Sequence, residues 1–349
     1  MKMWIMRRFF QLLSIPFKRS MINDGLISVS FMTEKIVGHG EDAPPILMAK
    51  GQSYAVGVFD GMGGAGAATC KSDYGEGLTK AYVASRITAS SVELYLSNHL
   101  NTEDVSTEDL KQIIMQRLKE EIQKYPPQTK SILRSKLVRD YPTTMALVVL
   151  TKGNDNISID SYWAGDSHCY LWTLKGFFQI SKDDLEEKND PMENLHNDSP
   201  ISNCICADRD FTINHQHIEL PKEPTIILVA SDGCFGYYPT PMHFEYVLSS
   251  TLQKANNEKD WECLIKENIM KVTGDDCSFS LIAIGFSSFE DFKKSMKAYK
   301  VEGFPILLEQ EETIAYFEKE LAKEKEMYEQ NVTARWEKYK SNYMKFIND

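Results

Sequence analysis

The 349-residue sequence contains no run of about 18 apolar residues, which is the length that a membrane-spanning helix requires. It also lacks a pair of Cys-x-x-Cys motifs, so its seven cysteines do not predict a zinc site, and we expect reduced thiols in a cytoplasmic protein. Basic residues are few, with 39 Lys and Arg against 50 Asp and Glu and a net charge of −11. This charge argues against nucleic acid as a partner.

The N-terminal residues 1–25 predict a separate arm. Residues 1–19 carry five basic side chains and no acidic one, and an apolar run, residues 9–17, lies among them. No small-x-small cleavage site follows, as a secretory signal would require. We interpret residues 1–25 as a basic and apolar arm. A weakly membrane-associated amphipathic segment and a signal peptide are the alternatives.

Residues 26–286 predict one α+β domain. Alternating or wholly apolar runs indicate strands at 27–31, 53–59, 144–150, 157–163, 168–174, 225–230 and 278–286. Two long helical patterns stand together at 67–100 and 107–139, which favours antiparallel sheets over a parallel sheet with alternating helices. A polar stretch at 182–210 reads as a long surface loop or flap.

Residues 287–349 predict a helical extension. From residue 309 onward, apolar and aromatic side chains recur at steps of three, four or seven and form one helical stripe. The stripe could pack on the parent domain, which is the simplest interpretation, pair with a second copy, or receive another partner. Its members are Ile314, Phe317, Leu321, Tyr328, Val332, Trp336, Tyr339, Tyr343 and Phe346.

Aspartates stand at the ends of several predicted strands. Asp60, Asp166 and Asp232 each follow an apolar run, and Asp275 precedes one. In antiparallel sheets the end of one strand lies beside the start of its neighbour, so these carboxylates can gather at one edge. Clustered carboxylates repel one another unless cations neutralise them. Hard divalent cations, Mg²⁺ or Mn²⁺, prefer such oxygen ligands and can prepare a water for attack on phosphorus.

The glycine run at 61–66 matches G-x-G-x-x-G after a strand, as in dinucleotide-binding proteins. Asp60 directly precedes it, where a carboxylate would repel a pyrophosphate, and no strand ending in an acid follows about 20 residues later. We therefore interpret the glycines as a tight turn whose bare backbone lets a metal approach the Gly61 carbonyl.

In their order and spacing, these motifs resemble the metal-dependent protein phosphatases, the type 2C serine/threonine phosphatases, in their bacterial form. The resemblance runs from about residue 26 to 286. The segments that carry it are Glu41-Asp42, Asp60-Gly61-Met62-Gly63-Gly64, Pro142-Thr143-Thr144, Gly165-Asp166-Ser167, Ser231-Asp232-Gly233 and Asp275-Asp276-Cys277-Ser278.

The resemblance implies a four-layer α-β-β-α sandwich of two antiparallel sheets flanked by long helices. It also implies two Mn²⁺ or Mg²⁺ ions, with a third held more weakly, and a phosphoprotein substrate. Asp60 would bridge two ions with the Gly61 carbonyl on one of them, and Asp232 and Asp275 would bind the first. Glu41 would hold the second through water, Asp166 would support the third, and a bridging hydroxide would attack phosphoserine or phosphothreonine. Asp60, Asp232 and Asp275 are thus the expected catalytic residues, with Asp276 as the alternative to Asp275.

The phosphate-binding residues depart from the family pattern. Val37 stands where an arginine usually holds phosphate, and Lys35 and His39 are the nearby candidates for that role. His168 replaces another usual arginine, and Phe235-Gly236 replaces a Trp-Asp pair. The preferred hypothesis is an active phosphatase. The alternative is a catalytically weak or inactive module that recognises a phosphoprotein.

Overall fold

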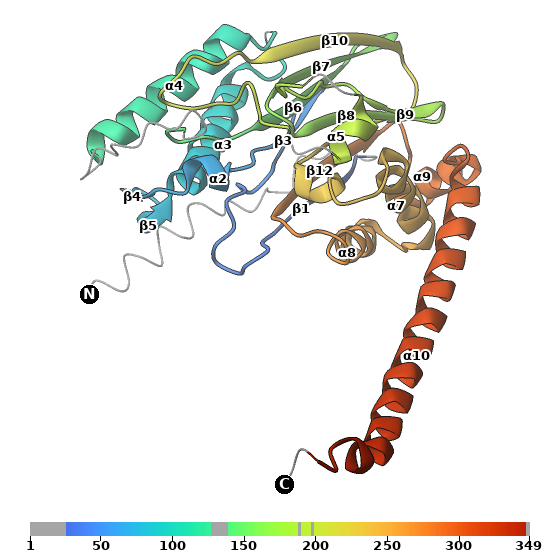
Figure 1. Ribbon diagram of the computed structural model, residues 1–349. Helices are drawn as coiled ribbons and strands as arrows, with labels where there is room; N and C mark the ends of the chain where they lie inside the picture. The colour runs from blue at the N-terminus through green and yellow to red at the C-terminus, as the bar shows by residue number, and fades with distance from the viewer. Residues whose placement is uncertain (1–25, 103, 127–138, 188–189, 197–198, 347–349) are drawn as a thin grey trace, which may run out of the picture. The chain divides into compact units, whose positions relative to one another are not determined.

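Two antiparallel five-stranded sheets stack face to face in the larger of two compact units (Figure 1). The computed structural model describes residues 26–102, 104–126, 139–187, 190–196 and 199–346. The units divide between Tyr299 and Lys300. The proposed N-terminal arm, residues 1–25, lies outside the described residues, so its interpretation stays a prediction.

Each sheet collects strands from distant parts of the sequence. One sheet has the order β1 (Ile27–Thr33), β12 (Cys277–Ile284), β11 (Thr225–Ala230), β8 (His168–Thr173) and β9 (Gly176–Gln179). The other has the order β10 (Asn214–Pro221), β7 (Asn156–Ala164), β6 (Met145–Lys152), β3 (Ser53–Val58) and β2 (Ile46–Lys50). A hairpin, β4 (Thr69–Ser72) and β5 (Gly75–Thr79), stands apart from both.

An apolar layer fills the space between the sheets. Side chains such as Val56, Val148, Ile227 and Ile282 meet there and are fully buried. Strands β3, β11 and β12 are buried at every position because both of their faces are covered. Strands covered on both faces have near-continuous apolar sequences, which is why these three were recognisable.

Helices form the two outer layers. The pair α3 (Lys80–His99) and α4 (Thr107–Lys124) packs on the sheet that contains β3, and α7 (Pro241–Lys254) with α8 (Glu258–Ile269) packs on the sheet that contains β12. Side-chain caps begin three of these helices, as Thr79, Ser106 and Asn257 each accept a hydrogen bond from the backbone N–H three residues onward. The predicted α-β-β-α sandwich is confirmed.

The predicted helix over 67–100 is wrong in its first part. A short helix, α2 (Gly63–Gly66), precedes the hairpin β4–β5, and α3 begins only at Lys80. Gly75 and Gly77 adopt φ values of +148° and +76°, which an α-helix does not tolerate. The second helix, α4, ends at Lys124, and residues 127–138 of that prediction lie outside the described residues.

Several elements escaped the sequence prediction. Strands β2, β9 and β10 and helices α7 and α8 were not anticipated. Strand β10, for example, is an edge strand with mostly exposed or half-buried side chains, so it has no apolar pattern to reveal it. The polar stretch at 182–210 has one short helix, α5 (Pro191–His196), and otherwise no regular element in its described residues.

The smaller unit contains one long helix, α10 (Phe304–Tyr343), which carries every member of the predicted stripe except Phe346, which lies beyond its end. Helix α9 (Phe289–Ser295) and a short 3₁₀ turn, Met296–Ala298, close the larger unit before it. Among the described residues, no helix combines the length and the apolar character needed to cross a membrane.

Ile282 tests the layer between the sheets, because its side chain has no exposed surface. We expect Ile282→Ala to lower the free energy of unfolding by about 2–5 kcal/mol, through lost burial and the cavity left behind. Urea denaturation measures the change. The matched control is Ile36→Ala at a side chain that is 61% exposed, where the expected change is below about 0.5 kcal/mol. Equal effects at the two positions would contradict this packing.

Candidate metal and active site

Three of the predicted aspartates lie where strands end. Asp60 follows β3, Asp166 follows β7 by one residue, and Asp232 begins the short helix α6 (Asp232–Phe235) after β11. Their charges act on one another, because the pKa values of Asp60 and Asp166 are each raised partly by Asp232. The sandwich therefore gathers these carboxyl groups at one edge, as the sequence predicted.

Asp60 stands at the centre of this cluster. It lies close enough to Asp42 and Asp232 for the three carboxyl groups to shift one another's pKa values. Burial, followed by the charges of Asp42 and Asp232, raises the pKa of Asp60 well above its ordinary value. Burial likewise raises the pKa of Asp42 to about 7 and raises that of Asp232. The group thus holds protons at a pH where ordinary aspartates are ionised.

The sequence prediction missed the role of Asp42, although it noted the acidic pair Glu41-Asp42. Asp42 is only 1% exposed. Its Oδ2 accepts a hydrogen bond of 2.9 Å from Ser231 Oγ, and Ser231 Oγ in turn accepts one of 2.8 Å from Ser278 N. The other oxygen, Asp42 Oδ1, is buried with no hydrogen-bond partner. A buried carboxylate oxygen without a partner is a strong unmet acceptor.

Glu41 packs against the glycine turn that follows Asp60. Its Oε1 accepts a 2.5 Å hydrogen bond from Thr79 Oγ1, and burial raises its pKa, with Asp276 and Asp275 adding to the shift. A Cβ atom on Gly63 would lie 1.7 Å from Glu41 Oε2, and one on Gly61 would lie 2.5 Å from the Glu41 carbonyl oxygen. The two glycines are therefore needed so that the Glu41 segment can approach this closely.

Asp275 and Asp276 have different surroundings. Asp276 Oδ1 and Oδ2 accept hydrogen bonds from Lys35 N at 2.8 Å and Glu41 N at 2.6 Å, so this carboxylate anchors the acidic loop. Asp275 is exposed, its Oδ1 accepts only the adjacent Asp276 N at 2.9 Å, and its charge raises the pKa of Asp232. Of the two, Asp275 has the carboxylate that is freer to face a ligand.

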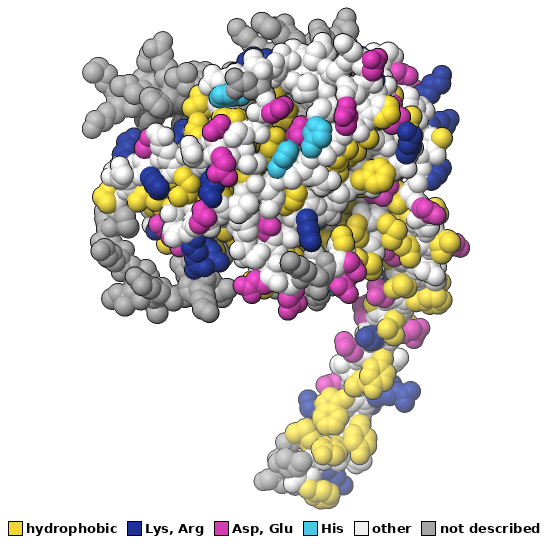
Figure 2. Space-filling view, turned by 90° about the horizontal axis from the view of Figure 1, so that it is seen from above, with side chains coloured by type: hydrophobic (Ala, Val, Ile, Leu, Met, Phe, Trp, Pro, Cys, Tyr) yellow, Lys and Arg dark blue, Asp and Glu magenta, His cyan; other side chains and the backbone are white. Residues whose placement is uncertain are grey.

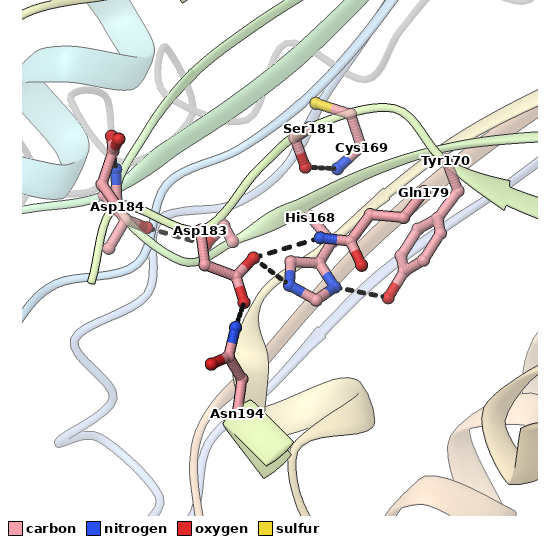
Figure 3. A network of polar contacts seen from close by, with 11 residues as sticks. His168, Cys169, Tyr170, Gln179, Ser181, Asp183, Asp184 and Asn194 are labelled. Atoms are coloured by element: carbon pink, nitrogen blue, oxygen red, sulfur yellow. Dashed lines mark hydrogen bonds and ion pairs between the residues drawn. The ribbon is translucent and has the colours of Figure 1, made fainter. Parts of the chain in front are cut away.

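A second polar network supports the turn that carries Asp166 (Figure 3). Buried His168 is 2.6 Å from the Tyr170 hydroxyl through Nδ1 and 2.7 Å from Asp183 Oδ1 through Nε2. Asp183 also accepts hydrogen bonds from Gln179 and Asn194. The charge of Asp183 adds to the burial that raises the pKa of Asp166.

His168 also stacks on Phe235, with ring centroids 3.9 Å apart. The two residues that depart from the family pattern after Gly165-Asp166-Ser167 and Ser231-Asp232-Gly233 are thus packed together. This stacking and the hydrogen bonds to Tyr170 and Asp183 make His168 a packing residue in the structure.

The expected phosphate-binding residues lie on an exposed loop. Lys35, Val37 and His39 are all exposed, and only the backbone of Lys35 contacts the carboxylate region, through Asp276. A different cation reaches this region. Arg86, on α3, donates a hydrogen bond of 3.3 Å to the Glu41 carbonyl oxygen, and its guanidinium lies 3.3 Å from the Tyr82 ring centre. The sequence prediction did not identify Arg86, since no motif contains it.

The carboxyl groups of the cluster fit a hard divalent cation. The donors are all oxygens, Asp42 Oδ1 lacks a partner, and burial with mutual repulsion raises the pKa values of four aspartates. In the part of the chain that the structure describes, no three or more His, Cys, Asp or Glu side chains form a ready-made metal site.

Comparison with known proteins identifies the family. Residues 40–270, about two thirds of the chain, match protein phosphatase 2C. The chain belongs to the protein phosphatase 2C family. No curated protein matches the sequence.

Solved structures agree on the fold. A bacterial serine phosphatase has a TM-score of 0.51 and 16% identity, with 74% of this chain and 97% of that chain covered. The serine/threonine phosphatase Stp1 from Staphylococcus aureus has the same TM-score and identity, with 74% and 94% covered. Identities this low establish the fold alone.

The raised pKa values predict how pH affects the metal-free protein. Asp60 and its neighbours keep their protons in the folded state, whereas in the unfolded chain an aspartate titrates near 3.8. Above pH 3.8 the folded state binds more protons than the unfolded chain, so the free energy of unfolding falls as pH rises from about 4 through about 7, the pKa of Asp42. The total loss is on the order of a few kcal/mol, since each unit of pKa shift contributes about 1.4 kcal/mol.

Urea denaturation at a series of pH values, in the presence of a chelator, measures this loss. Asp60→Asn removes the central charge and should raise the stability of the metal-free protein at pH values above the transition. Asp155→Asn at an exposed turn is the matched control and should change nothing. A free energy of unfolding that rises through the same pH range would contradict this account of the carboxyl groups.

Proposed function

We propose that this protein is a metal-dependent phosphatase that hydrolyses phosphoserine and phosphothreonine in proteins. The observation that carries the proposal is the gathering of the buried Asp42, Asp60 and Asp232 carboxyl groups, which raise one another's pKa values, at one edge of a protein phosphatase 2C fold. Buried carboxyl groups that lie close together destabilise a fold when they are ionised, and divalent cations bound to them remove this repulsion.

The residues that would hold two Mn²⁺ or Mg²⁺ ions are the clustered oxygen donors. These donors would be Asp60, the Gly61 carbonyl, Asp232, Asp275 and Glu41, and Asp166 would serve a third, weaker ion. When bound, such ions supply Lewis acidity that ionises a water near neutral pH and neutralises phosphoryl oxygens. The protein itself positions these donors. In the metal-free state their carboxyl groups hold protons.

Supports around the cluster position these donors. Thr143 Oγ1 and Thr144 N donate hydrogen bonds of 2.6 and 2.8 Å to the Asp60 carbonyl oxygen and fix the backbone from which its carboxyl group projects. Asp276 and Arg86 anchor the Glu41 segment from opposite sides. Lys35 and His39, on the exposed loop beside Asp276, are the candidates for contact with the phosphate of the substrate.

Substitution of the central aspartates tests the proposal directly. With Mn²⁺ present, we expect release of phosphate from a phosphoserine peptide and from an aryl phosphate. Asp60→Asn and Asp232→Asn should each lower kcat by about 10²–10³-fold, the usual cost of one lost electrostatic contact in a transition state. Asp155→Asn is the control and should retain wild-type activity.

Two outcomes would count against catalysis. Release that needs no divalent ion, or that survives both central substitutions, would exclude the proposed site. Binding of Mn²⁺ and of a phosphopeptide without any release would favour the alternative, a phosphatase-like module that recognises a phosphoprotein without turnover.

Substitutions of Asp275 and of Asp276 should cause different defects. Asp275→Asn leaves few contacts unpaired, so we expect unchanged stability but a higher Mn²⁺ concentration for half-maximal activity. Asp276→Asn leaves one of two backbone N–H groups without its acceptor, so we expect a loss of about 1–3 kcal/mol in the free energy of unfolding. Urea denaturation and Mn²⁺ titration of activity separate the two. The reverse pattern would assign the ligand role to Asp276.

A further inference from the structure

Helix α10 carries a stripe of large apolar side chains that its own unit leaves exposed. Within α10, the exposed fractions of the stripe members range from 42% for Trp336 to 70% for Tyr328, and the one buried residue of the helix is Phe304 at its start. Figure 2 shows hydrophobic side chains along this helix. Its 40 residues correspond to a length of about 60 Å. The exposed apolar stripe occupies this helix from Ile314 to Tyr343, and an exposed apolar face of this extent marks an interaction surface.

The spacing of the stripe is symmetric about Gln330. Around Gln330, six members of the stripe fall at equal distances in three pairs, which are Tyr328 with Val332, Leu321 with Tyr339, and Phe317 with Tyr343. Because each residue advances a helix by about 1.5 Å, two helices that run in opposite directions and cross at Gln330 bring the members of each pair to the same height. A parallel pair of helices needs no such symmetry, so the spacing points to antiparallel pairing with an identical helix.

The charges along α10 also differ between its two halves. Residues 309–320 contain five acids and one base, whereas residues 335–345 contain four bases and one acid. Parallel pairing of two copies would place acid beside acid and base beside base. Antiparallel pairing places the acidic half of one copy beside the basic half of the other, which is favourable.

Glu324 sits in the stripe itself and fixes the register further. It occupies the seven-residue step between Leu321 and Tyr328, and its mirror position about Gln330 is Trp336, next to Arg335. With Glu320, which lies one helical turn earlier, it faces the end of the second copy that carries Arg335 and Lys338. A lone polar residue in an apolar seam is a known way to set register and partner number. Lys325 and Arg335 also come level with each other, and this like-charge pair opposes the association.

We propose that α10 is a dimerisation helix that pairs in antiparallel orientation with α10 of a second copy of this chain. This assembly is independent of the proposed phosphatase activity, because it uses none of the residues of the carboxylate cluster.

The test uses the full chain and two charge-reversal variants. The acid-side variant is Glu320→Lys with Glu324→Lys, and the base-side variant is Arg335→Glu with Lys338→Glu. The control, Glu312→Lys with Glu326→Lys, makes the same charge change as the acid-side variant on the helix face away from the stripe. Sedimentation equilibrium should give the wild-type chain a mass of about twice 39.9 kDa.

Each variant alone places like charges together, so its dimer dissociation constant should rise by at least about tenfold. An equal mixture of the two variants restores opposite charges across the seam and should form heterodimers within about threefold of wild-type affinity. The control variant should dimerise as the wild type does. Circular dichroism and hydrolysis of an aryl phosphate show whether each variant is folded, so a failure to associate is distinguished from a failure to fold.

Several results would overturn the proposal. A wild-type chain that sediments as a monomer, or as an oligomer larger than two, would exclude the helix pair. A dimer that neither charge variant weakens, or that the control weakens equally, would place the contact elsewhere. A mixture that fails to recover association would exclude the antiparallel orientation.

Discussion

The close grouping of the buried carboxyl groups of Asp42, Asp60 and Asp232 is the constraint on which the rest of the site depends. Three buried acids cannot all be ionised side by side, so either protons or cations must neutralise them. In the metal-free protein this neutralisation falls to protons, since burial and the neighbouring charges raise the pKa values of these carboxyl groups. The repulsion destabilises the metal-free fold. It also favours the binding of small, hard cations at this edge of the sandwich.

The scaffold can bear this repulsion because the surrounding packing fixes the backbone. Strands β3 and β11 deliver Asp60 and Asp232 from two different sheets, and the apolar layer between the sheets fixes their separation. Ser231 and Ser278 connect β11 and β12 to Asp42. The side chains in the cluster are therefore held by hydrogen bonds made elsewhere, and a local change in their charge need not disturb the sheets.

The sequence revealed the parts of the fold that have a simple physical pattern. Strands β3, β11 and β12 are apolar throughout because both faces are covered, and the aspartates at their ends stood out against those runs. Edge strand β10 and the hairpin β4–β5 escaped because tertiary contacts and glycine turns, and not apolar periodicity, place them. Asp42 and Arg86 escaped for a related reason: burial and hydrogen bonding to distant segments define their roles, and neither is visible in local spacing.

Proton release on metal binding tests the central claim most directly. Mn²⁺ can be titrated into the full chain by calorimetry, in two buffers that differ in ionisation enthalpy, which counts the protons displaced per ion. If the clustered carboxyl groups hold protons until an ion replaces them, binding below pH 7 releases protons, and the number falls as pH rises past the pKa of Asp42, which is about 7. Binding that displaces no protons below pH 7, or an absence of binding, would contradict the account.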